Sequence, residues 1–153
     1  MCAAVPVAVA LGAAPASAAQ DPSNLAFVDA VGTQQIIDWV RRTVGRALTY
    51  EYRHLDDLER FVADVGTTAY IGRQDAHLDD DRTTLTRQKI VVTARVVGVG
   101  VRDLRADRAQ LLVYWDQTRT RGDVDRTETT GSASIVEIRM VDGTWKLDGL
   151  TPA

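Results

Sequence analysis

The sequence predicts an α+β fold in which N-terminal helices pack on a curved, four-stranded antiparallel sheet. Before Gln88, apolar residues recur every three or four positions, a spacing that places them on one face of a helix. After Gln88, β-branched residues dominate and apolar positions alternate with polar ones, which indicates strands. The length of 153 residues suits one domain with its own core.

The first 20 residues form a separate apolar segment, and residues 21–153 are predicted to form the domain. Residues 1–19 carry no charge and are rich in Ala and Val. They suit either a signal peptide cleaved near Ala16-Ser17-Ala18 or a membrane anchor, since a helix of this length spans about 28 Å. No basic residue precedes the run, so we expect the natural start to lie upstream. Both interpretations place the domain outside the cytoplasm, in the cell envelope.

Three helical regions are predicted next. The first has an apolar stripe from Ile36 to Leu48, with Thr33 as its N-cap. The second covers 56–65 and stops at Gly66. The region 67–88 has few apolar anchors, so it is predicted as a broken third helix. Its last part would be capped by one of three consecutive aspartates, Asp79, Asp80 or Asp81.

The remaining chain is predicted as a meander of four strands. The first contains Gly98 and Gly100, which suggest a bulge or a bend. Asp142-Gly143 indicates a two-residue hairpin turn, and alternation then places Trp145 and Leu147 together on the inner face. The predicted strands cover 89–101, 109–116, 127–140 and 144–148. A return at 101–107 and a charged hairpin loop at 118–126 complete the path.

Composition and spacing argue against several kinds of site. The net charge of −3 gives no general attraction to nucleic acid. Cys2 is the only cysteine, and neither His54 nor His77 stands at a metal-ligand spacing. The acidic residues Asp75 and 79–81 lack the alternation and the central glycine of a calcium loop. No nucleophile elbow or phosphate-binding loop is present, so we predict no metal, no cofactor and no catalytic residue.

Four stretches of the sequence carry a family resemblance: 24–33 (NLAFVDAVGT), 88–101 (QKIVVTARVVGVGV), 108–118 (RAQLLVYWDQT) and 141–152 (VDGTWKLDGLTP). In this order they resemble the actinobacterial Mce-associated membrane proteins. The Asp-Gly-x-Trp-x-Leu run near the C-terminus is also similar to the wider NTF2-like and SnoaL-like superfamily. The resemblance implies an NTF2-like cone domain behind a membrane anchor. It also implies a supporting role beside Mce transporters, which import lipids or steroids.

Two functions follow from the resemblance and the residues together. The first is a non-catalytic accessory subunit that docks on Mce-family transporter proteins, with a lipid as a further partner. Its candidate contacts are Arg119, Arg121 and Arg126 in the charged loop.

The alternative is a SnoaL-like ligand-binding protein or isomerase with an apolar pocket. Some NTF2-like enzymes pair a pocket Asp with a Tyr, and the candidate pocket residues here are Tyr114, Trp115, Asp116 and Trp145. Alternation places Tyr114 and Asp116 on the strand face opposite Trp115, so we rank catalysis below docking.

Overall fold

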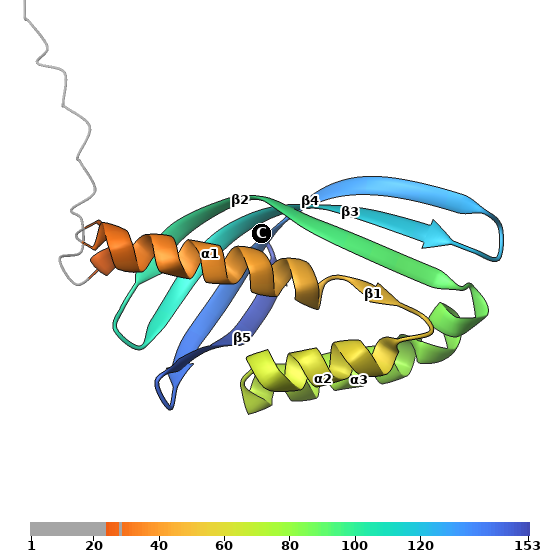
Figure 1. The fold of residues 1–153 in the computed structure, drawn as a ribbon, viewed down its shortest axis with the longest axis horizontal. Helices are drawn as coiled ribbons and strands as arrows, with labels where there is room; N and C mark the ends of the chain where they lie inside the picture. Colours follow the sequence, from red (N-terminus) through yellow and green to blue (C-terminus); the bar gives the residue numbers. More distant parts are fainter. Residues whose placement is uncertain (1–23, 28) are drawn as a thin grey trace, which may run out of the picture.

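The computed structural model describes residues 24–153 apart from Val28, and only the backbone of Phe27. The apolar segment 1–20 therefore lies outside the described residues. Helices precede an antiparallel sheet, as predicted (Figure 1). The helical elements are η1 (Leu25–Phe27), α1 (Ala30–Ala47), α2 (Leu55–Val65) and α3 (Thr68–Arg87). The strands are β1 (Tyr50–Glu51), β2 (Ile90–Leu104), β3 (Arg108–Arg121), β4 (Arg126–Val141) and β5 (Thr144–Pro152).

The sheet has five strands in the order β1-β2-β3-β4-β5, where the sequence predicted four. The additional strand, β1, pairs Tyr50 with Val92 and Glu51 with Val91. A strand of two residues is too short to show an alternating pattern, so periodicity does not reveal it. The last strand also continues to Pro152, four residues beyond its predicted end.

Both long helices differ from the prediction at their starts or in their continuity. The N-cap of α1 is Asp29, whose Oδ1 accepts from the Gly32 amide at 2.8 Å, and not Thr33. The third helix is continuous over 20 residues and is capped by Thr67, not by an aspartate at 79–81. Its buried residues are Tyr70 and Leu85, one near each end, and this wide separation hides the periodicity that marks most packed helices.

Register shifts curve the sheet. In the β2–β3 pair they lie between Val96 and Gly98, where the glycines predicted a bulge, and between Val101 and Asp103. Bulges bend a strand and increase its twist. Figure 1 shows α1 crossing the curved sheet, with α2 and α3 side by side.

The charged segment predicted as a loop is mostly strand. β3 runs to Arg121 and β4 starts at Arg126, so the turn contains only residues 122–125. We call residues 116–132 the distal tip. β5 pairs with β4 only from Ser134 onward, so β4 forms an open edge of the sheet along the tip. Thr-rich strands form here without a core because cross-strand hydrogen bonds and side-chain pairs hold them.

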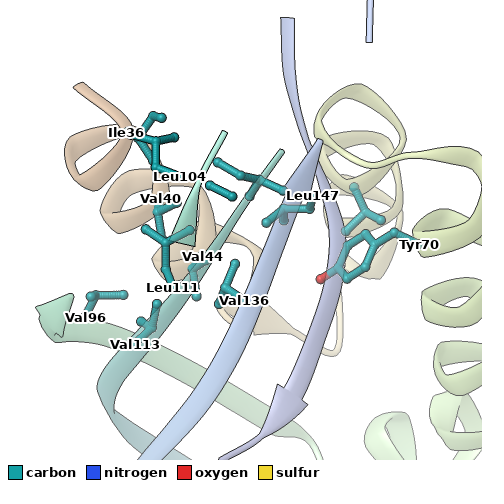
Figure 2. Close-up of a cluster of buried hydrophobic side chains, with 13 residues drawn as sticks. Ile36, Val40, Val44, Tyr70, Val96, Leu104, Leu111, Val113, Val136 and Leu147 are labelled. Atoms are coloured by element: carbon teal, nitrogen blue, oxygen red, sulfur yellow. The ribbon is translucent and has the colours of Figure 1, made fainter. Parts of the chain in front are cut away.

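The core lies at the other end of the sheet, against α1. Leu111, Val113 and Leu147 are fully buried there. Figure 2 shows Leu111 and Val113 on the side of the buried α1 residues, and Leu147 on the side of Tyr70. Burying apolar side chains of this size contributes roughly 1.5–3 kcal/mol each. A second, smaller cluster joins Leu55 and Leu85 to residues Ile90 and Val92 of β2.

Candidate functional site

A cavity of about 230 Å³ lies between α1, the α2–α3 pair and the sheet. Its walls are mostly apolar, and polar side chains stand around them. Leu48, Tyr50, Leu58, Leu78 and Gln117 line it, together with Ala47, Glu59, Val62, Gln74, Asp75, His77, Asp81 and Leu85. Apolar walls with a few polar groups are typical of a small-molecule site.

Tyr50 is the most distinctive polar group of the cavity. Burial raises the pKa of its hydroxyl, and the nearby charge of Arg119 only partly opposes this effect. Within the described residues, this hydroxyl has no hydrogen-bond partner, so it is free to bond a ligand. The same part of the chain holds no group of three His, Cys, Asp or Glu side chains arranged for a metal ion.

The three arginines named from the sequence share one face of the distal tip. In the β3–β4 register, Arg119 lies opposite Glu128 and Arg121 lies opposite Arg126. Directly paired residues point to the same face. That face is concave, because Gln117 lies on it and lines the cavity. The structure therefore brings the three candidate contacts together.

Two of these arginines are held by nearby carboxylates. Arg121 donates to Asp123 at 2.9 Å, and Arg126 pairs with Glu128. Hydrogen bonding to Asp123 raises the pKa of Arg121, and the same bond lowers the pKa of Asp123. Arg119 forms no ion pair with any residue that the structure describes. Exposed pairs of this kind contribute little to stability, so a partner can displace them.

Of the four candidate pocket residues, Tyr114, Trp115 and Asp116 line one open hollow, and Trp145 lies apart from it. Tyr114 is half exposed, and with Asp116 it lies on the convex face beside Val97. Trp115 lies on the other face, where its indole nitrogen donates to Ser134 at 3.1 Å. Trp145 is half-buried at the opposite end of the sheet. No Asp–Tyr pair therefore faces the cavity from this set.

Trp145 lines a different groove, where the described chain begins. This groove has a volume of about 370 Å³ and lies between α1 and the β2–β3 turn. Trp39 of α1 lines it as well, with Leu25, Arg42 and Leu104. Among residues 24–153 apart from Val28, no helix is both long and apolar enough to cross a membrane.

Sequence reasoning missed the side chain that fixes the start of the domain. Asn24 is buried, and its amide donates to the Arg102 carbonyl at 3.0 Å. Its Oδ1 accepts from the amides of Leu104, at 2.9 Å, and Ala26, at 3.1 Å. These bonds hold the chain to the end of β2 that lies farthest from the distal tip. No local pattern indicates contacts across about 80 residues of sequence.

Comparison of the sequence with known proteins finds no matching family profile. It finds two uncharacterized proteins of Mycobacterium tuberculosis, MT1407 and Rv1362c, each 33% identical over 66 residues. That match covers 43% of this chain and 30% of each relative. The chain thus spans less than a third of the length of these relatives.

Comparison of structures finds the fold in several proteins of low sequence identity. An IcmL-like type IV secretion system protein from Legionella pneumophila has a TM-score of 0.66 at 12% identity, over 78% of this chain and 92% of that one. CagV, a VirB8 homolog from Helicobacter pylori, has a TM-score of 0.59 at 9% identity, over 77% and 97%. An NTF2-like superfamily protein from Salmonella enterica has a TM-score of 0.55 at 12% identity, over 79% and 94%. The chain therefore has an NTF2-like α+β fold.

Proposed function

We propose that this protein is a non-catalytic accessory subunit that docks on other proteins of the cell envelope. More specifically, we assign the protein to an Mce-type lipid or steroid import system. In this proposal the apolar segment 1–20 attaches the domain to the membrane. The observation that carries the docking role is the concave face of the distal tip, where three arginines lie beside an open strand edge.

The position of the tip supports this role. Asn24 ties the start of the domain to the end of β2 beside Arg102 and Leu104. β3 then runs 14 residues from that end to Arg121, a length of about 45 Å. A domain attached through its N-terminus therefore presents the tip far from its attachment point, as Figure 1 shows.

The chemistry of the tip suits an acidic, extended segment of a partner. Every residue from 122 to 132 is exposed, and no strand in the described part of the chain pairs with the outer side of β4 there. An extended segment can add to such an edge through backbone hydrogen bonds. Arg119, Arg121 and Arg126 would pair with its carboxylates, because arginine binds them in a bidentate manner.

The resemblance to Mce-associated proteins supports the choice of transporter. The solved neighbours add support for the envelope, since their names include secretion-system proteins and a periplasmic fragment of TraM. Those names describe the neighbours themselves. That this chain also lies in the envelope is part of the proposal.

Co-purification tests the docking role. A tagged full-length chain, cross-linked and purified from mildly solubilised membranes of its native host, should recover Mce-family proteins. Changing Arg119, Arg121 and Arg126 together to Gln should reduce that recovery. The matched control changes Arg41, Arg87 and Arg95 to Gln, because these exposed arginines lie outside the tip. Equal recovery by both variants would exclude the tip, and recovery without Mce-family proteins would exclude the transporter.

A second candidate function is small-molecule binding in the cavity, favoured by the free hydroxyl of Tyr50. Its test is a fragment screen by NMR on the full chain and on the Tyr50→Phe variant. Ligands that shift the amides around Leu78 and Gln117, and that bind more weakly to the variant, would support it. Isomerase activity in the purified chain would replace the accessory role with an enzyme.

A further inference from the structure

The groove between Trp39 and Trp145 differs from the surroundings of Trp115. The chain has three tryptophans. The Trp115 indole donates to Ser134, whereas the indole nitrogens of Trp39 and Trp145 have no hydrogen-bond partner within the described residues. Both rings pack partly against the core and remain partly exposed along the groove. The groove therefore presents two apolar rings with free donors.

The groove also carries a free cation. Arg42 lines it and forms no ion pair or hydrogen bond with the residues that the structure describes. Nearby acidic side chains already have partners: Asp29 caps α1, and Asp103 pairs with Arg105 at 3.0 Å. Val31, in the first turn of α1, is 70% exposed. Unpaired arginine, exposed apolar surface and aromatic rings with free N–H groups thus occur at one end of the domain.

The preceding chain limits how far this end can lie from a membrane. Residues 20–23 are the four residues between the uncharged run 1–19 and Asn24. Four residues span at most about 14 Å when fully extended. Leu25, which follows Asn24, is itself part of the groove wall. If the uncharged run inserts in a bilayer, this end of the domain therefore lies within reach of the lipid head groups.

We infer that the groove binds the phospholipid head-group layer of the membrane in which the N-terminal segment is anchored. This inference rests on the membrane attachment proposed above. Tryptophan rings are enriched at this depth, where an apolar body meets lipid and a polar edge meets water. The Arg42 guanidinium pairs with lipid phosphate, which it recognises in a planar, bidentate geometry. This contact would orient the domain with α1 near the membrane and the distal tip away from it.

The tryptophans themselves report on the contact. The full-length chain is reconstituted in vesicles of phosphatidylcholine and phosphatidylglycerol that contain a brominated lipid as quencher. Three variants, made by Trp→Phe changes, each keep one tryptophan. We expect the quencher to reduce the emission of Trp39 and Trp145. Trp115 should keep its emission, because it lies seven positions along β3 from Arg108, where β3 leaves the end of the sheet that carries the groove. Each variant is first shown to fold by its thermal transition.

Changes at Arg42 separate the phosphate contact from the apolar one. Arg42→Ala should reduce quenching of Trp39 in vesicles with phosphatidylglycerol. Arg95→Ala is the matched control, since Arg95 is exposed on β2 and also has no partner in the described residues. Flotation with the vesicles but no quenching at either groove tryptophan would overturn the inference alone. Failure to float with vesicles would instead overturn the proposed membrane attachment, and the inference with it.

Discussion

The same two strands, β3 and β4, are buried at one end of the sheet and exposed at the other. Near α1, β3 and β4 bury Leu111, Val113, Val136 and Ile138 almost completely. In the distal tip the same two strands keep their hydrogen-bonded register, yet every residue from 122 to 132 is exposed. The end of the sheet near α1, which we call the proximal end, is stabilised by apolar burial. The tip is stabilised by backbone hydrogen bonds between β3 and β4 and by side-chain pairs such as Thr118–Thr129.

This difference separates stability from interaction. Residues of the proximal end are occupied by the core, and their substitution should change folding. Residues of the tip contribute little to packing, so their side chains remain available to a partner. The comparison predicts that sensitivity to mutation falls steeply along β3, from Leu111 to Thr120.

The largest effect should come from truncation at the centre of the core. Leu111 is fully buried, and Leu111→Ala should lower the free energy of unfolding by about 2–5 kcal/mol. Leu112→Ala is the matched control, because Leu112 is only half-buried on the other face of the strand. Denaturant titration measures both variants. Equal losses would show that the two faces of β3 are equally packed and would break the comparison.

Alkaline pH should test the proximal end next. Burial raises the pKa of Tyr70 to about 12, although Arg73 and Gln74 partly oppose it. A raised pKa stabilises the fold fully below the unfolded pKa of about 10, and this contribution is lost as the pH rises toward 12. The loss is about 2–3 kcal/mol, from roughly two pKa units.

The Tyr70→Phe variant should remove that share of the alkaline loss. Its control is Tyr114→Phe, which removes the same hydroxyl from a side chain that is 50% exposed. Unfolding curves between pH 9 and 12 make the measurement on the chain and both variants. If stability falls with pH as steeply in Tyr70→Phe as in the unmodified chain, this hydroxyl ionises as readily in the folded protein as in the unfolded chain.

The order of elements was predictable because it depends on local periodicity. The change from helical to alternating spacing near Gln88 gave the helices and the meander. Asp142-Gly143 gave the turn, where both residues have positive φ, 49° and 75°. The continuity of α3 was not predictable, since Tyr70 and Leu85 alone are buried on 20 residues. Within the tip, residues 118–126 were predicted as a loop because charged residues and threonine on both faces produce no alternation.

The candidate sites depend on register and on distant contacts, which the sequence does not show. Arg119, Arg121 and Arg126 were named from their charge, but only the β3–β4 pairing places them on one face. The cavity joins Tyr50, Leu78 and Gln117 from three separate segments. Tyr114 and Asp116 were named as a residue pair suited to catalysis, but they line an open hollow on the convex face, apart from the cavity that Tyr50 lines.

Asn24 offers a smaller test, at the boundary between the core and the chain before it. Asn24→Ala removes three hydrogen bonds, and it leaves the Leu104 amide without its acceptor. An unsatisfied buried amide costs about 1–3 kcal/mol. Faster hydrogen exchange at Leu104 should accompany this loss. Gln34→Ala is the control, because its bond to Asp38 is exposed, and it should change little.

The smallest effect should come from the tip. Thr118 and Thr129 lie opposite each other with their hydroxyls 3.1 Å apart, as do Thr120 and Thr127. Cross-strand pairs of this kind contribute about 0.2–1 kcal/mol. Thr118→Ala and Thr129→Ala, combined in a double-mutant cycle, should therefore change the free energy of unfolding by less than about 1 kcal/mol. The same variant should keep its recovery of partner proteins, because both threonines lie on the face opposite the arginines. A loss comparable to that of Leu111→Ala would mean that the tip folds as part of the core. In that case its exposed residues would be under structural constraint, and the separation of stability from interaction would fail.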